Sequence, residues 1–371
     1  MPRVPEVPLR GQEWPDLQIW MPLAGVLQTG SIIVDVRSPV EFEEDHLPGS
    51  SNVPLFTDQE RSVVGTLFRH LGPEEARNWG EERVTAELDN LTRDLLAALR
   101  LDEDPPFDGL RVVCCSRGGE RSEAVVKYLR SIGYPVVMLE GGYRSYRKGV
   151  RETLQRFQPQ RLVVLDGLTG CGKTRVLRQV ARICPRQVID LEGAAGHRSS
   201  LLGDIGLEPV SQKRFEGRLA DSSRSLDGDA RWILVEGESR RVGDREIPAP
   251  LWQAMENAPR IELIATREER VRLLCQEYLA ADGVEPLRQR LPALAGFDGI
   301  GEEGVKTLDA LLATGDVEEA ARILLEKHYD PRYRHGNQER VFADTIPMED
   351  SVDTARGLVA LLDGGVGTQE G

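Results

Sequence analysis

Residues 161–174 read RLVVLDGLTGCGKT, and this stretch decides the fold of the second half of the chain. Residues 161–165 form a short apolar run typical of a buried strand. Residues 167–174 follow closely and match the pattern G-x4-G-K-[ST] in full, just before a helical stretch. In such a loop the backbone N–H groups and the lysine hold a di- or triphosphate, and the last hydroxyl can ligate Mg²⁺. The residues assigned to phosphate binding are Gly167, Gly170, Gly172, Lys173 and Thr174.

The pattern leaves the phosphate ligand open, because it fits a nucleotide and a prenyl diphosphate equally well. Further apolar runs at residues 187–191, 232–235 and 261–264 predict more strands alternating with helices, which indicates a mostly parallel sheet. Glu236 follows one of these runs, where a Walker B acid often lies, and an ordinary strand end is the alternative interpretation. The phosphate-binding domain is assigned to residues 151–265. Residues 266–371 are predicted to form a helical C-terminal region packed on that domain.

Residues 1–150 are predicted to form a separate α/β domain. Short apolar runs at residues 31–36, 111–115 and 135–139 predict strands. Helical patterns lie between them, at residues 82–100 and 120–132.

The segment VCCSRGGERS, residues 113–122, carries the second chemical signal. A strand ends at Cys115, a short loop follows, and a helix starts near Glu120. A thiol there faces backbone N–H groups and a helix N-terminus, both of which favour the thiolate. The same cradle suits an anionic sulfur, selenium or phosphorus group. The residues assigned to the anion cradle around the thiol are Arg117, Gly118, Gly119 and Arg121.

The sequence allows two alternatives to a reactive Cys115. A pair of buried strand cysteines suits Cys114, which should face the opposite side of the sheet, better than Cys115. The spacing of Cys115 and Arg121 also matches the C-x5-R pattern of cysteine phosphatases. Such enzymes usually have a histidine just before the cysteine, and here that position holds Cys114.

Composition indicates an ordinary globular protein without structural metal or disulfides. The chain has 371 residues, and its five cysteines include no CxxC pair. The five histidines show no metal-ligand spacing, so no metal site is assigned to them. The sequence has neither an apolar run of membrane-spanning length nor an apolar N-terminal leader, which predicts a cytoplasmic protein with no membrane contact.

Charge is distributed unevenly along the chain. The net charge is −14, which argues against a general nucleic-acid binder. Residues 141–190 nevertheless hold eleven Lys/Arg and three acids, so this window carries +8. Spacing of three or four residues places a basic stripe on one helix face. A polyanion-binding surface and a solvated helix face are both open. The stripe consists of Arg144, Arg147, Lys148 and Arg151.

Residues 32–54, IIVDVRSPVEFEEDHLPGSSNVP, resemble the opening signature of rhodanese domains, with Asp35, Arg37, His46, Asn52 and Pro54 among the matching positions. For Asp35 and His46 we favour structural hydrogen bonding. The resemblance implies that the later cysteine, Cys115, carries a persulfide. The expected fold class is therefore α/β, a rhodanese-like domain followed by a P-loop NTPase-like domain with a helical C-terminal region.

The whole chain resembles tRNA 2-selenouridine synthases. The resemblance covers roughly residues 30–335, and one departure from it is Ser116, at a position that is often aromatic. It rests on both sites and on further segments, which are RSVVGT (61–66), GGYRSYR (141–147), DLEGAAGHRS (190–199), QKRFE (212–216), VEGESRRVG (235–243) and HYDPRY (328–333).

This resemblance implies a tRNA-modifying transferase. Its expected reaction replaces the sulfur of wobble 2-thiouridine by selenium from selenophosphate, through an S-geranyl intermediate made from geranyl diphosphate. Cys115 falls on the reactive cysteine of the family, and the P-loop is expected to hold the geranyl diphosphate. No tightly bound cofactor is expected; the co-substrates are selenophosphate and geranyl diphosphate, and Thr174 of the P-loop can ligate Mg²⁺. The anticodon loop of tRNA is expected to contact the basic stripe, across the junction between the two domains.

Two other functions are compatible with the same motifs. One is a rhodanese–P-loop kinase fusion that acts on a small sulfur metabolite. The other is a non-enzymatic, nucleotide-switched binding module, against which the intact Cys115 loop argues.

Overall fold

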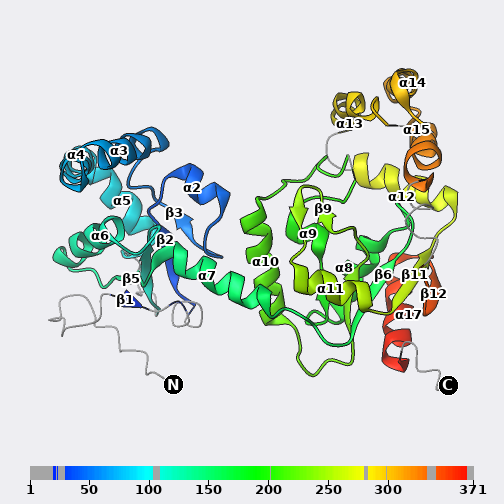
Figure 1. Ribbon diagram of the computed structural model, residues 1–371, viewed down its shortest axis with the longest axis horizontal. Helices are drawn as coiled ribbons and strands as arrows, with labels where there is room; N and C mark the ends of the chain where they lie inside the picture. Colours follow the sequence, from blue (N-terminus) through cyan, green and yellow to red (C-terminus); the bar gives the residue numbers. More distant parts are fainter. Residues whose placement is uncertain are drawn as a thin grey trace. The chain divides into compact units, whose positions relative to one another are not determined.

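The computed structural model describes residues 20–21, 23, 30–102, 109–200, 202–279, 283–297, 299–331 and 340–365. The chain divides into two compact units, Met1–Arg151 and Glu152–Gly371 (Figure 1). Arg332 and Tyr333, the end of the HYDPRY segment, lie outside the described residues.

The first unit is built on a parallel sheet of five strands in the order β1-β5-β4-β2-β3. The runs expected at residues 31–36, 111–115 and 135–139 are confirmed as β2, β4 and β5. The short edge strands β1 and β3 were not predicted. The five strands are β1 (Trp20–Met21), β2 (Ile32–Asp35), β3 (Ser51–Asn52), β4 (Arg111–Cys114) and β5 (Val137–Leu139).

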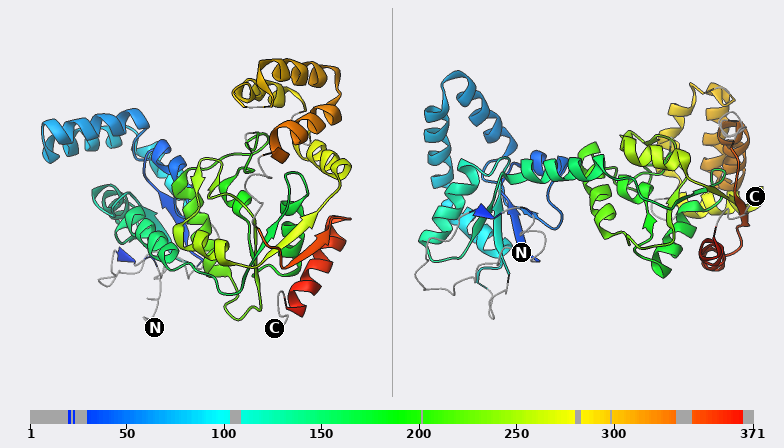
Figure 2. Two further views of the ribbon diagram at one scale, coloured as in Figure 1. Left: turned by 45° about the vertical axis from the view of Figure 1, so that its right-hand side comes forward. Right: turned by 60° about the horizontal axis from the view of Figure 1, so that its bottom comes forward.

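Helices cover this sheet, and α5 and α6 bury leucine and valine side chains against its strands. The single helix expected at residues 82–100 is wrong, because the backbone breaks at Glu87. There the N–H turns back to Val84 and Thr85 instead of continuing the helical ladder. The helices are α2 (Pro39–Glu44), α3 (Asp58–His70), α4 (Pro73–Ala86), α5 (Leu88–Ala98), α6 (Glu120–Ser131) and α7 (Gly142–Gln155). Figure 2 shows α3 and α4 side by side as a hairpin.

The second unit contains a parallel sheet in the order β12-β11-β6-β8-β7 and a small antiparallel pair, β9 and β10. The four runs expected at residues 161–165, 187–191, 232–235 and 261–264 are confirmed as strands. The strands are β6 (Leu162–Asp166), β7 (Val188–Ile189), β8 (Ile233–Glu236), β9 (Arg241–Val242), β10 (Arg245–Glu246), β11 (Arg260–Ile264) and β12 (Asp344–Pro347).

The C-terminal region is not wholly helical, which corrects the sequence prediction. β12 pairs in parallel with β11 and extends the sheet. Its four residues, DTIP, are mostly exposed and include only one large apolar side chain. The strand therefore has no apolar run by which the sequence could predict it. The residues that follow it form α17 (Ser351–Gly364), which packs against α8 (Lys173–Ile183) over the sheet.

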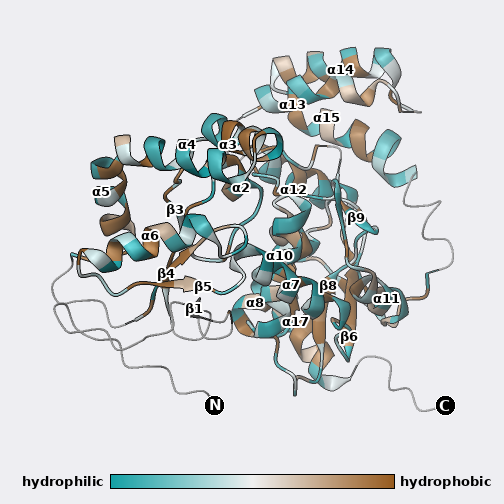
Figure 3. Cartoon of the chain, turned by 60° about the vertical axis from the view of Figure 1, so that its left-hand side comes forward, coloured by the Kyte–Doolittle hydropathy of each residue, from teal (hydrophilic) through white to brown (hydrophobic). Residues whose placement is uncertain are grey.

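The remaining helices of this unit pack around the sheet or form a helical block with its own leucine-rich core. Figure 3 shows hydrophobic residues on the strands and mixed faces on the helices. These elements are α9 (Leu191–Ala195), α10 (Gln212–Ser225), α11 (Ala249–Asn257), α12 (Arg267–Leu279), α13 (Glu285–Arg290), the 3₁₀ helix η1 (Leu291–Leu294), α14 (Gly301–Thr314), α15 (Val317–Leu324) and the π-helix η2 (Leu325–Tyr329). Within the described ranges, none of these helices has the length and hydropathy needed to cross a bilayer.

Candidate functional site

The Cys115 loop joins β4 to α6, as the sequence predicted. Cys115 is the first residue after the strand, and its side chain is 3 % exposed. Its Sγ lies 3.1 Å from the hydroxyl of Ser122, one turn into α6. Gly118 has a φ of 62°, and a Cβ there would come within 2.6 Å of the carbonyl of Leu139. Glycine at this position therefore lets the loop close around the sulfur.

Electrostatics separates the two neighbouring cysteines. Burial raises the pKa of the Cys115 thiol, but hydrogen bonds from the Ser122 hydroxyl and from the backbone N–H groups of Ser122, Arg117 and Gly119 outweigh it, so the pKa is lowered overall. Cys114 is the last residue of β4, and its complete burial raises the pKa of its thiol well above the ordinary value. Only Cys115 is therefore set up to act as a thiolate.

The arginines of the loop act differently from the sequence expectation. Arg121 donates to Glu41 of α2 at 3.1 Å, and Arg61 of α3 approaches the same carboxylate at 3.4 Å. Arg117 supports the thiolate through its backbone N–H, while its residue is exposed. The residue that sequence reasoning missed is Ser122. Its position in the first turn of the helix after the Cys115 loop is the feature that could have identified it.

Replacing Ser122 by alanine is expected to raise the pKa of Cys115 and slow its alkylation. Loss of a hydrogen bond to a charged group should reduce the rate at neutral pH roughly tenfold. The measurement is iodoacetamide labelling of Cys115 against pH, followed by peptide mass spectrometry. Ser131→Ala, an exposed serine on the same helix, is the control. An unchanged pH profile in Ser122→Ala would show that the backbone N–H groups alone lower the pKa of the Cys115 thiol.

Residues of the rhodanese signature contact the start of α7, which in turn contacts the Cys115 loop. Asp35 and Arg37 form a buried ion pair at 2.6 Å, and the Arg37 guanidinium lies 3.8 Å from the centroid of the Tyr143 ring. His46 contacts the Phe42 carbonyl at 2.7 Å, in line with the structural role that we favoured. The N–H of Tyr143, in α7, donates to the carbonyl of Cys115 at 2.9 Å. These contacts place the start of α7 against the thiol loop.

The basic stripe on α7 comprises three residues instead of four. Arg144, Lys148 and Arg151 are exposed and spaced four and three apart on the helix. Arg147 is buried and approaches Asp45 at 3.5 Å, so it does not belong to the stripe. The Arg144 N–H donates to the carbonyl of Ser116 at 3.0 Å. The stripe therefore begins at the Cys115 loop.

The P-loop connects β6 to α8, as expected. Gly167, Gly170 and Gly172 have φ values of 143°, 80° and 92°, a region that favours glycine. Lys173 Nζ donates to the Gly167 carbonyl at 2.8 Å, across the loop. Cys171 is buried within the loop and fills space beneath Gly167, as predicted.

Buried polar contacts support the P-loop from outside. Asp166 accepts from the N–H of Gly167 at 2.9 Å and from Arg260 and Arg340 at 3.0 and 2.7 Å. Arg270 Nε donates to the Thr169 carbonyl at 2.8 Å. The loop is thus held in shape by side chains that do not occupy its cradle.

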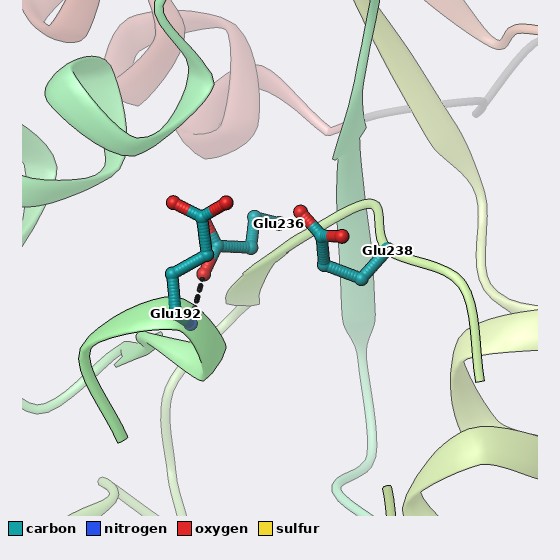
Figure 4. A group of neighbouring side chains, drawn as sticks. All are labelled: Glu192, Glu236 and Glu238. Atoms are coloured by element: carbon teal, nitrogen blue, oxygen red, sulfur yellow. Dashed lines mark hydrogen bonds between the residues drawn. The ribbon is translucent and has the colours of Figure 1, made fainter. Parts of the chain in front are cut away.

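Three glutamates lie close together at the end of the sheet (Figure 4). Their carboxylate oxygens, from Glu192, Glu236 and Glu238, lie within 4.8 Å of one another. The Thr174 hydroxyl lies 2.7 Å from Glu192 and 3.0 Å from Glu236. This hydroxyl has a single proton, so it can donate to only one of the two carboxylates at a time. Sequence reasoning found only Glu236; Glu192 and Glu238 were missed, although each follows a strand end by a few residues.

Burial raises the pKa of Glu236 well above its ordinary value, and the Glu192 carboxylate adds to the rise. Burial and the same neighbour raise the pKa of Glu238 to about 7. The sequence assigned no residues to a metal other than Thr174. The all-oxygen donor set found here suits Mg²⁺.

The raised pKa of Glu238 predicts that stability falls as pH rises. The folded state binds a proton that the unfolded state has released, so the stabilisation is complete below about pH 4.5 and is lost as pH rises through about 7. Because Glu238 retains some exposure, we expect on the order of 1 kcal/mol, or ~2–4 °C in Tm. Thermal unfolding without divalent cations, from pH 5 to 8, measures it. Glu238→Gln should flatten the profile, and a profile equal to that of the wild type would contradict the assignment.

Comparison with known proteins agrees with this geometry. Residues 23–148 match the model of the rhodanese-like domain, and residues 160–312 match that of the tRNA 2-selenouridine synthase AAA domain. Relatives named tRNA 2-selenouridine synthase come from three bacteria. That of Cupriavidus pinatubonensis is 33% identical, over 84% of this chain and 90% of its own. That of Cupriavidus necator is 34% identical with the same coverage, and that of Nitrosomonas europaea is 32% identical over 71% and 68%. The chain therefore belongs to the tRNA 2-selenouridine synthase family.

Proposed function

We propose that this chain is a tRNA-modifying transferase that replaces the sulfur of wobble 2-thiouridine by selenium. The selenium comes from selenophosphate, and the reaction passes through an S-geranylated nucleoside made from geranyl diphosphate. The observation that carries the proposal is the Cys115 thiol, whose pKa is lowered in a cradle of N–H groups, in a chain that also holds a complete P-loop. The proposal takes tRNA as the substrate from the names of the relatives.

The P-loop is assigned to the first half of the reaction. The sulfur of 2-thiouridine attacks the first carbon of geranyl diphosphate, a C–S bond forms, the C–O bond breaks, and diphosphate leaves. Lys173 and the N–H groups of the loop stabilise the charge that develops on the leaving diphosphate. Mg²⁺, when bound, would neutralise further charge on the same group. Thr174, Glu192, Glu236 and Glu238 would hold the ion, since all four offer oxygen ligands.

The Cys115 loop is assigned to the second half, in which selenium enters at the second carbon of the base and geranyl thiol leaves. The N–H groups of Arg117, Gly119 and Ser122 suit an anionic donor such as selenophosphate. In this proposal the Cys115 thiolate attacks the phosphorus of selenophosphate, so that an S–P bond forms, the P–Se bond breaks and selenide is released. The selenide attacks the second carbon of the base and displaces geranyl thiol, which takes the selenide's proton, and water then cleaves the S–P bond to release phosphate and restore the thiol.

The exposed stripe on α7 is proposed as a tRNA contact. Because it begins at the Ser116 carbonyl, phosphates bound along it would place a splayed wobble base near Cys115. The rest of the chain outside the basic window carries −22, which disfavours RNA elsewhere.

Reversing Arg144, Lys148 and Arg151 to glutamate should weaken tRNA binding and flatten its salt dependence. Each lost phosphate contact removes roughly 0.7–0.9 from the slope of log affinity against log salt. The measurement is binding of tRNA carrying 2-thiouridine to the full chain over a salt series. Arg69, Arg93 and Lys127, reversed together, give the same charge change on exposed positions of other helices. Equal losses of tRNA affinity in both triple variants would mean that net charge alone causes the loss and that the stripe is not the tRNA contact.

The decisive test is mass spectrometry of wobble nucleosides from cells with and without the gene, grown with selenium. We expect 2-selenouridine only when the gene is present, and S-geranyl-2-thiouridine when Cys115 is replaced. Unchanged nucleosides in both strains would overturn the proposal. They would favour the rhodanese–P-loop kinase fusion acting on a small sulfur metabolite.

A further inference from the structure

An apolar cavity of about 50 Å³ lies in the second unit, between α12 and the helical block of α13, η1, α14, α15 and η2. Leucines from α12, α13, η1, α14 and α15, together with Leu202, form more than half of its lining, and Ala320 and Ala321 of α15 form a small-residue side. The polar groups at its edge are the Tyr278 and Tyr329 rings and Cys275. A space with such an apolar lining accepts apolar guests.

The cavity wall is shared with the phosphate-binding site. Leu274 lines the cavity and also packs against Gly170 of the P-loop, where a Cβ would come within 2.9 Å of Leu274 Cγ. One turn earlier on α12, Arg270 holds the Thr169 carbonyl. The same helix therefore contacts the phosphate loop and the apolar cavity.

A second connection runs through the carboxylate cluster. Tyr278, one turn after Leu274, lines the cavity, and its hydroxyl lies 2.9 Å from the Ser200 hydroxyl. The neighbouring residue, Ser199, donates its N–H to Glu192 at 3.1 Å. The loop that contacts Glu192 of the cluster thus also contacts the cavity wall.

We infer that this cavity receives the hydrocarbon chain of a diphosphate ester whose head group is held by the P-loop. An anion cradle and an apolar space that share one helix fit a ligand with a charged head and an apolar tail. The inference rests on the proposed function of the P-loop as a diphosphate site, and it adds the place of the chain and the selection for its length.

The cavity in its present form has room for only part of a ten-carbon chain, so its wall must move when the chain enters. The π-helix η2 provides Tyr329 to this wall, and π-helical turns are often found where a helix adapts to a ligand. Each methylene that leaves water strengthens binding by about fourfold. Geranyl diphosphate should therefore bind at least ~100-fold more tightly than inorganic diphosphate if several carbons are buried.

The test compares inorganic diphosphate with geranyl diphosphate by calorimetry on the full chain. Ala320→Val and Ala321→Val each add two methyl groups to the small-residue side of the cavity. Ala310→Val, on the exposed face of α14, is the matched control. We expect each filling variant to lose ~10-fold or more in geranyl diphosphate affinity, about the contribution of two methylenes, with diphosphate affinity unchanged. The control should match the wild type for both ligands.

The outcomes separate the two proposals. If the wild type binds the two ligands equally, or if both filling variants keep full geranyl diphosphate affinity, the cavity does not take the chain and the P-loop assignment stands. If neither ligand binds the wild type, the P-loop assignment fails and the inference fails with it. Thermal unfolding of both filling variants identifies one that has lost its fold, and the other variant then decides.

Discussion

Cys115→Ser is expected to abolish selenium transfer to the wobble nucleoside, and Cys114→Ser is expected to leave it largely intact. The thiolate is the reactive form of cysteine, and a serine hydroxyl in the same cradle stays protonated at neutral pH. Of these two thiols, Cys115 has the lowered pKa, because hydrogen bonds from Ser122 and the loop N–H groups outweigh the opposing effect of burial. Cys114 is fully buried in β4, and its register partner is Asp35 of β2.

The measurement is formation of 2-selenouridine by the full chain from tRNA, selenophosphate and geranyl diphosphate. Geranyl transfer to the 2-thiouridine should survive in Cys115→Ser, because Lys173 and its loop belong to the other compact unit. This retained half-reaction is also the control for folding. Full selenium transfer by Cys115→Ser together with loss in Cys114→Ser would mean that the reactive thiol is Cys114.

The parts of the fold that were predictable are those that short segments encode. Gly167–Lys173 needs glycines at positive φ next to a strand and a helix, and this demand is visible in the residue types themselves. The same holds for the Cys115 loop, because strand, glycines and helix start lie within ten residues. Buried central strands such as β4 and β6 form uninterrupted apolar runs for the same reason.

The parts that were missed depend on contacts between distant segments. β12 is an edge strand that exists because β11 offers it a partner. Arg147 looked like the other cations of its helix, and its burial is set by Asp45, about a hundred residues earlier in the chain. Glu192 lies in the first turn of α9 and Glu238 in the loop after β8, and the parallel order of β7 and β8 brings these two segments to one end of the sheet. No local pattern carries that information.

Lys173→Ala is expected to remove most of the affinity for the diphosphate ligand. Lys173 opens α8, and its Nζ lies at the mouth of a loop built from N–H groups, where it is held by the Gly167 carbonyl. Without it, one phosphate charge would be bound without its partner. Truncation of one member of a desolvated charge pair costs about 2–5 kcal/mol, or roughly 30- to 5,000-fold in affinity.

Titration of geranyl diphosphate and ATP separately, into wild type and Lys173→Ala, measures this loss and identifies the ligand. Lys306→Ala, an exposed lysine on α14, removes the same charge away from the loop and should change neither affinity. Because the alanine variant also frees the Gly167 carbonyl, Lys173→Arg serves as a second variant that retains a donor and a charge, and it should recover part of the binding. If geranyl diphosphate is the ligand, its affinity falls in the alanine variant while ATP binds weakly to every form. Equal, weak binding of both ligands to wild type and variant would mean that Lys173 contributes nothing to affinity. The P-loop, although its three glycines have positive φ values, would then not hold a diphosphate.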